Sequence, residues 1–152
     1  MKSHSKLEVA KTQLDRAIML YFEGDYYSAA TLAGASEEIL GKFLDKQGSE
    51  SDLKNQIRTT QALGERLFGE QYNETHVASM INDVRNWLKH FTEGKDLEFD
   101  EEEAAADLID RASNNYSMLT GLTGEETEDM RRFLSSRIDP HNAAVRSQLP
   151  NA

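Results

Sequence analysis

The sequence contains no cysteine and little proline or glycine. Its 152 residues include two Pro and nine Gly. The lack of cysteine excludes disulfide bonds, Cys-ligated zinc or iron–sulfur sites and a cysteine nucleophile. Both prolines, Pro140 and Pro150, lie near the C-terminus, so a helix elsewhere meets no proline break. The scarcity of turn residues also argues against a β-sandwich or a small barrel.

Long apolar runs are missing as well. No segment approaches the ~20 apolar residues that cross a bilayer, and the N-terminal residues do not resemble the apolar centre of a signal peptide. We therefore expect a cytoplasmic protein with no membrane contact. Apolar residues still make up 38 % of the chain, which suffices for one packed core at this length. We expect a single domain over residues 1–140, followed by a flexible tail over residues 141–152.

The acidity of the chain is concentrated in one segment. The net charge is −10, and residues 93–129 hold 13 acidic and 2 basic side chains. An acidic chain gains no general attraction for nucleic acid, so a role in nucleic-acid binding requires a local site. The acidic run at residues 100–103 is typical of a helix start, because carboxylates are favoured in the first turn.

Apolar residues recur at spacings of three and four in every long segment, which predicts helices. The expected helices lie between start and stop residues: Ser5 to Gly24, Asp25 to Gly48, about Asp52 to Phe68, Asn73 to about Gly94, Asp100 to Gly121, and a short last helix that opens at residues 123–126. Five or six helices joined by short loops predict an all-α antiparallel helical bundle.

The fourth expected helix carries the residues with chemical potential. On an ideal helix its seven apolar residues lie within about 60° of Val84, and this stripe is typical of a core face. The polar residues occupy the opposite arc, so we expect them to be exposed together. A guanidinium, an amide, an ammonium and an imidazole on one exposed arc can bind a phosphate and move protons. These side chains belong to Arg85, Asn86, Lys89 and His90.

The segment Arg85-Asn86-Trp87-Leu88-Lys89-His90 has the form Arg-Asn-x-x-x-His. Chance gives this strict pattern on the order of 0.01 times in such a chain. The pattern resembles the signature of HEPN domains, the "higher eukaryotes and prokaryotes nucleotide-binding" helical bundles. The broader sequence, from residues 17–24 through residues 130–133, is also similar to uncharacterised bacterial HEPN-like proteins, so the resemblance extends over nearly the whole chain.

The resemblance implies a homodimer in which two motif helices face one cleft and cleave RNA without a metal ion or cofactor. Carried over by position, His90 transfers protons, Arg85 stabilises charge on the phosphate and Asn86 orients the pair. Lys89 lies outside the signature, and we expect it to help bind the phosphate of the substrate. HEPN-like ribonucleases of the toxin type also imply a cognate antitoxin or a nucleotidyltransferase-like partner.

Two other interpretations remain open. The same bundle can serve as a non-catalytic module that binds a protein or a nucleotide through the motif face or the acidic residues 98–110. Alternatively, the bundle is unrelated to HEPN domains and the hexapeptide is a coincidence, because each polar residue has an ordinary structural role. A lone Arg on a helix usually forms a surface ion pair, and a His near a helix end interacts favourably with the helix dipole.

Overall fold

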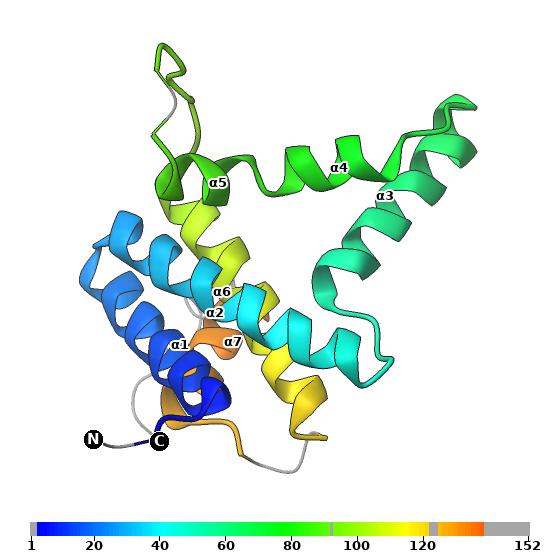
Figure 1. Ribbon diagram of the computed structural model, residues 1–152. Coiled ribbons are helices and arrows are strands. Elements are labelled where there is room, and N and C mark those ends of the chain that lie inside the picture. The colour runs from blue at the N-terminus through cyan, green and yellow to red at the C-terminus, as the bar shows by residue number, and fades with distance from the viewer. Residues whose placement is uncertain (1–2, 92, 122–124, 139–152) are drawn as a thin grey trace, which may run out of the picture.

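Helices are the only regular secondary structure in the part of the chain that a computed structural model describes, residues 3–91, 93–121 and 125–138. This confirms the all-α prediction. Seven helices follow one another along the described residues (Figure 1), namely α1 (Lys6–Glu23), α2 (Tyr26–Lys46), α3 (Asp52–Phe68), α4 (Glu74–Ile81), α5 (Asp83–Lys89), α6 (Glu101–Leu119) and α7 (Glu128–Ile138).

The predicted start residues cap their helices. The side chain of Asp25 accepts a hydrogen bond from the backbone N–H of Ser28 at 3.2 Å, and that of Asp100 accepts from Glu103 at 2.9 Å. The Asn73 side chain accepts from two backbone N–H groups at the start of α4. These bonds satisfy donors that have no partner within the helix. At the end of α1, Gly24 adopts φ 82°, which is the left-handed conformation that favours glycine.

The core lies where α1, α2 and α6 pack together, and α7 packs against α1 behind α2 in the view of Figure 1. Its fully buried side chains include Leu14 and Ile18 of α1, Leu40 of α2, Ile109 of α6 and Phe133 of α7. Alanines fill much of α2 and α6 at this contact, so the two helix backbones approach closely.

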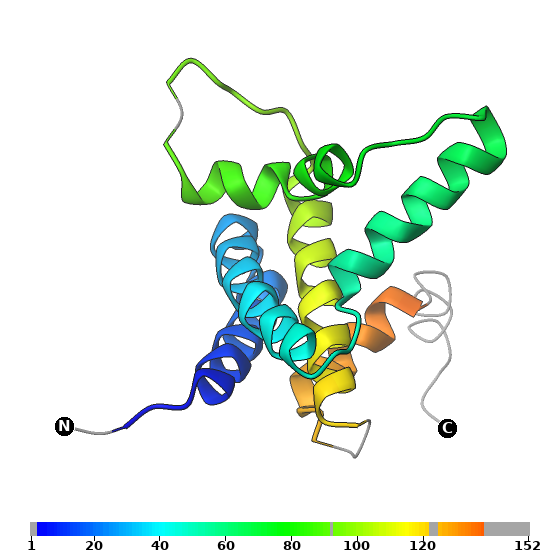
Figure 2. The same ribbon diagram turned by 45° about the vertical axis from the view of Figure 1, so that its right-hand side comes forward.

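Helices α3 and α4 form an arm that projects from the bundle (Figure 1), and Figure 2 shows α3 extending away from α6. α3 contacts α6 and α4, whereas α4 reaches the bundle chiefly through α5, which lies against α2. The arm exposes apolar side chains near the end of α3, where Leu63, Leu67 and Phe68 are all at least half exposed. The described chain therefore leaves this apolar surface without cover.

The prediction of the fourth helix is wrong in the extent of the helix and in the face that it buries. It divides into α4 and α5 at Asn82, and α5 ends at Lys89 rather than near residue 94. Of its expected core stripe, Val77 is buried, but Met80 is 63 % exposed and Phe91 is 95 % exposed. Trp87 is also exposed. The described chain therefore leaves part of the stripe, notably Met80 and Phe91, without cover.

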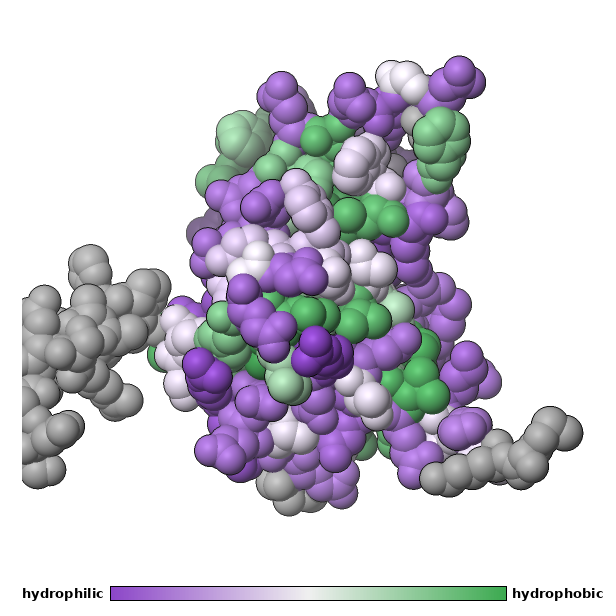
Figure 3. Space-filling view, turned by 90° about the vertical axis from the view of Figure 1, so that its left-hand side faces the viewer, coloured by the Kyte–Doolittle hydropathy of each residue, from purple (hydrophilic) through white to green (hydrophobic). Residues whose placement is uncertain are grey.

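Surface hydropathy varies over short distances. On the face viewed in Figure 3, hydrophobic residues reach the surface in patches separated by hydrophilic ones. None of the described helices is long and apolar enough to cross a membrane. The expected tail over residues 141–152, and the expected start of the last helix at residues 123–124, lie outside the described residues. α7 itself begins at Glu128, after Thr127 accepts a hydrogen bond from the backbone N–H of Met130.

Candidate functional site

A glycine on α2 makes room for the first residue of the motif. Arg85 of α5 lies over Gly34, and a Cβ atom added at Gly34 would be 2.8 Å from Cγ of Arg85. Any larger residue at position 34 would therefore push against the middle of the Arg85 side chain. The absence of a side chain at Gly34 lets α5 approach α2 closely, and this approach carries the Arg85 guanidinium group to a buried carboxylate.

That carboxylate belongs to Glu37, which is 2 % exposed. Nη1 of Arg85 lies 2.8 Å from Oε2 of Glu37, and Nη2 of Arg111 on α6 lies 3.0 Å from Oε1. A buried carboxylate is costly unless cations and hydrogen bonds compensate it, and here two guanidinium groups do so. The cluster of Arg85, Glu37 and Arg111, which we call the buried triad, ties α2, α5 and α6 together and leaves one net positive charge.

The buried triad also explains the break between α4 and α5. Nη2 of Arg111 donates a hydrogen bond to Oδ1 of Asn82 at 2.9 Å. Asn82 is 7 % exposed and has φ −99° and ψ 4°, outside the usual helical range. A long-range contact to α6 therefore accompanies the local departure of Asn82 from helical geometry.

A second, exposed cluster lies one residue further along α2. Oε2 of Glu38 is 2.7 Å from Nζ of Lys89, and Oε1 is 2.7 Å from Nζ of Lys42. Hydrogen bonds from Lys42 and Lys89 lower the pKa of Glu38 to about 2. Two ammonium groups share this carboxylate, so the cluster again carries one net positive charge. Unlike the buried triad, it is open to solvent, because the Glu38 side chain is 37 % exposed.

The remaining motif residues meet at a different place. Asn86 and His90 are both exposed, and they line a hollow of about 290 Å³ together with Asp83, Trp87 and Lys95. His90 follows the last residue of α5 and has an extended backbone, with φ −125° and ψ 126°. The hollow that His90 lines also contains an amide, an ammonium group and the carboxylate of Asp83.

Aromatic contacts hold the wall of this hollow. Nε1 of Trp87 donates a hydrogen bond to the backbone carbonyl of Lys95 at 2.8 Å. The Trp87 ring meets the ring of Phe99 edge to face at 5.9 Å, and Phe99 in turn meets Tyr27 of α2 at 6.4 Å. These contacts anchor the segment before α6 to both α5 and α2.

The structure thus separates the residues that the sequence placed on one arc. Arg85 and Lys89 reach toward carboxylates of α2, whereas Asn86 and His90 face the hollow beside Lys95. The expectation that Arg85 is exposed is wrong, since its side chain is only 14 % exposed. Helical periodicity describes one helix by itself, so it could not predict that the neighbouring α2 buries Arg85 through an ion pair.

Two residues of the site were missed by the sequence reasoning. Glu37 occupies the apolar stripe of α2, between the buried residues Ala33 and Leu40, and Arg111 occupies that of α6, beside Leu108 and Ala112. A charged residue at a core position of an amphipathic helix signals a buried partner of opposite charge. One acidic and one basic interruption of this kind on two helices would have pointed to the pair.

A larger hollow of about 400 Å³ lies beside the buried triad and is distinct from the His90 hollow. Its lining includes Arg85, Arg111 and the aromatic ring of Phe99, but also carboxylates of α6 such as Asp107. Arg137 of α7 forms ion pairs with carboxylates of this lining, at 3.1 Å from Glu103 and 3.6 Å from Asp107. The acidic start of α6 thus pairs within the chain and holds α7 in place.

Metal binding has no obvious location in the described part of the chain, where no three His, Asp or Glu side chains are grouped to hold an ion. Comparisons of the sequence with protein-family models and with curated proteins, and of the fold with solved structures, find no match. The chemistry of the chain therefore has to be argued from its own residues.

Proposed function

We propose that this chain is a cytoplasmic HEPN-like protein that binds RNA and cleaves it without a metal ion, with His90 as the proton-transfer residue. One observation carries this function. The Arg-Asn-x-x-x-His motif ends on an exposed imidazole, and that imidazole shares a hollow with Asn86 and Lys95. An imidazole, an amide donor and an ammonium group are the chemical groups required to bind a phosphodiester and to move a proton near neutral pH.

The reaction uses the nucleophile that RNA itself provides. The imidazole of His90 accepts the proton of a ribose 2′-hydroxyl, whose oxygen attacks the adjacent phosphorus and forms a new P–O bond. The bond from phosphorus to the 5′-oxygen of the next nucleotide breaks, and that oxygen takes a proton from a second, protonated imidazole. The products are a 2′,3′-cyclic phosphate and a 5′-hydroxyl. All atoms and protons of this reaction are accounted for, and it requires neither an oxidant nor a metal ion.

A homodimer supplies the second imidazole in this proposal. The apolar surface near the motif supports an interface there, because Phe91 follows His90 directly and is 95 % exposed, and Met80 is 63 % exposed. Exposed aromatic and Met side chains are enriched at the centres of protein interfaces. Two copies joined through this surface would bring two His90 hollows together. A cognate antitoxin or a nucleotidyltransferase-like protein that covered the same surface would compete with this dimer.

Arg85 acts differently here from what the resemblance implies. Its guanidinium group is paired with buried Glu37, so in a single chain it is poorly placed to neutralise a phosphate in the His90 hollow. We assign Arg85 a positioning role, in which its ion pair fixes α5 on α2 and thereby fixes the location of His90. Its loss should reduce activity through misplacement of His90.

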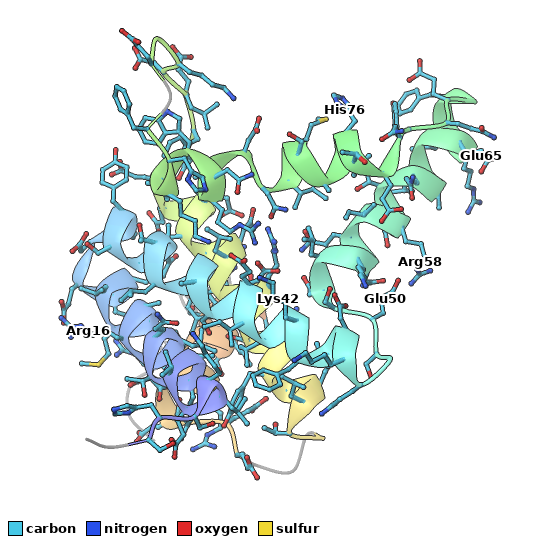
Figure 4. The ribbon with its side chains drawn as sticks, in the orientation of Figure 1. Arg16, Lys42, Glu50, Arg58, Glu65 and His76 are labelled. Atoms are coloured by element: carbon cyan, nitrogen blue, oxygen red, sulfur yellow. The ribbon has the colours of Figure 1, made fainter. Side chains whose placement is uncertain are left out.

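The experiment compares two exposed histidines. RNA is incubated in EDTA with wild-type protein, with His90→Ala and with His76→Ala, which changes a histidine on the outer side of α4 (Figure 4). We expect wild type and His76→Ala to cleave equally, and His90→Ala to be slower by about 10²- to 10⁴-fold, the usual contribution of a general acid or base. Equal rates for all three proteins, or no cleavage by wild type on varied RNAs, would refute catalysis by His90.

A non-catalytic interaction module is the second candidate function. The observation that favours it is the uncovered apolar surface of the arm, where Leu63, Leu67 and Phe68 are 50 %, 65 % and 69 % exposed. Under this alternative the chain binds a protein partner through the arm. RNA would then remain intact, and Leu67→Asp would abolish association while His90→Ala would have no effect.

A further inference from the structure

An unusual group of lysines lies along α2 in this acidic protein. Lys6, Ile39, Lys42, Phe43 and Lys46 line a hollow of about 270 Å³ between the start of α1 and the second half of α2. Three ammonium groups thus surround an apolar floor that contains an aromatic ring. None of these residues belongs to the motif or to the buried triad.

The lysines form a continuous track with the motif helix. Lys42 and Lys46 are four residues apart on α2, so they project from the same side, with about 6 Å of helix between them. The ammonium groups of Lys42 and Lys89 both lie 2.7 Å from the carboxylate of Glu38, which makes them neighbours. Lys89 and His90 line a further common hollow of about 350 Å³. The track therefore runs from Lys6 and Lys46, through Lys42 and Lys89, to His90.

The charge of this track opposes that of the whole chain. Of its four ammonium groups, those of Lys42 and Lys89 share the carboxylate of Glu38, and the hollow of Lys89 and His90 adds Lys95 and Asp96, whose charges cancel. The track thus carries three net positive charges on a protein of net charge −10. Lys6 and Lys46 form no ion pair within the described part of the chain. Figure 4 places Lys42 on α2 between α5 and the start of α3. A local positive stripe of this kind is typical of a surface that binds a polyanion.

We infer that this lysine track binds single-stranded RNA that flanks the scissile phosphate, with phosphates on the ammonium groups and a base against Phe43. Single-stranded nucleic acid is bound by positive grooves combined with aromatic side chains on which bases stack. The track supplies both features, since Phe43 is half-buried among the lysines. This inference deepens the proposed function, because it locates the substrate beyond His90.

The test measures binding without cleavage. A labelled 2′-O-methyl oligouridine of about ten nucleotides is titrated with protein between about 50 and 200 mM salt, and anisotropy gives Kd. Each phosphate contact to a single strand contributes about 0.7 to the slope of log Kd against log salt concentration. We expect Lys46→Gln and Lys6→Gln each to lower the slope by about 0.7. The matched control is Lys54→Gln, an exposed lysine of α3 that pairs with Asp45.

The aromatic floor has its own pair of variants. Phe43→Leu keeps an apolar side chain but removes the ring, and we expect Kd to rise about tenfold, within the range found when a stacking ring is removed. Phe68→Leu changes an exposed ring on α3 and should leave Kd unchanged. Equal effects of Lys46→Gln and Lys54→Gln, or equally tight binding of a poly-glutamate of similar charge, would overturn the inference.

The two proposals fail in different ways. If wild-type protein binds the 2′-O-methyl strand through the lysines but never cleaves RNA, the proposed nuclease activity is refuted and RNA binding by the lysine track is retained. Cleavage whose rate and salt dependence are the same for wild type and Lys46→Gln would refute the track and leave the nuclease.

Discussion

Two adjacent glutamates of α2 allow the energy of burial to be measured directly. Glu37 and Glu38 each bind two cationic side chains, at 2.8 and 3.0 Å for Glu37 and at 2.7 Å twice for Glu38. Their exposure differs greatly, because the side chain of Glu37 is 2 % exposed and that of Glu38 is 37 % exposed. At either position the substitution Glu→Gln preserves the side-chain shape, removes the negative charge and replaces one acceptor oxygen with an NH2 donor.

We expect the two substitutions to differ by several kcal/mol. Glu37→Gln leaves two buried guanidinium groups without a counter-charge, and loss of one partner from a buried ion pair costs about 3–5 kcal/mol. Glu38→Gln removes two exposed pairs, each with a free energy of about 0–1 kcal/mol, because water screens the charges and the long lysines lose entropy. Small domains have only about 5–15 kcal/mol of stability in total, so Glu37→Gln should unfold at much lower denaturant concentration.

The assay is urea unfolding at pH 7, monitored by circular dichroism, for wild type, Glu37→Gln and Glu38→Gln. The free energies of unfolding are compared, provided that the three proteins have the same m-value. Loss of similar free energy of unfolding in both variants would contradict the importance of the buried triad. A more stable Glu37→Gln protein would contradict it more strongly, because the uncompensated guanidinium groups would then cost nothing.

The remaining predictions concern close packing and pH. We expect Gly34→Ala to destabilise the protein by about 1–3 kcal/mol, because the added Cβ would crowd Arg85. The Cβ of Gly41→Ala would lie 3.5 Å or more from its neighbours, so this variant should be as stable as wild type or gain up to about 1 kcal/mol from helix propensity. Thermal unfolding of the two variants distinguishes these outcomes. Burial and Glu102 raise the pKa of Tyr21 from 10.0 to about 12. The stability that Tyr21 contributes is therefore fully present below pH 10 and falls as the pH rises toward 12. Phenolate absorbance is titrated in wild type and in Tyr21→Phe, and the difference between the two curves should show this late ionisation.

Local chemistry made most of the fold predictable. The ends of helices depend on residues next to them in sequence, which is why Asp25, Asn73 and Asp100 were correctly identified as caps. The break at Asn82 could not be predicted in the same way, because its side chain accepts a hydrogen bond from Arg111, 29 residues further along the chain. The apolar spacing continues across Asn82, so periodicity alone predicts one continuous helix there.

The candidate site was only partly predictable for a related reason. Periodicity correctly placed Asn86 and His90 in solvent, but it also placed Arg85 there, because the carboxylate of Glu37 lies 48 residues away in sequence. The same reasoning buried Phe91, which is 95 % exposed. An apolar stripe shows that a surface needs cover, and it does not show whether the cover comes from the same chain.

Product analysis of RNA treated in EDTA is the most direct test of the proposed chemistry. Mass spectrometry of the fragments should find 2′,3′-cyclic phosphate and 5′-hydroxyl ends with wild-type protein, and a 2′-deoxy nucleotide at the scissile position should abolish the cut. Fragments that end in 3′-hydroxyl and 5′-phosphate, or cleavage that persists at the 2′-deoxy position, would contradict attack by the ribose hydroxyl and with it the role of His90.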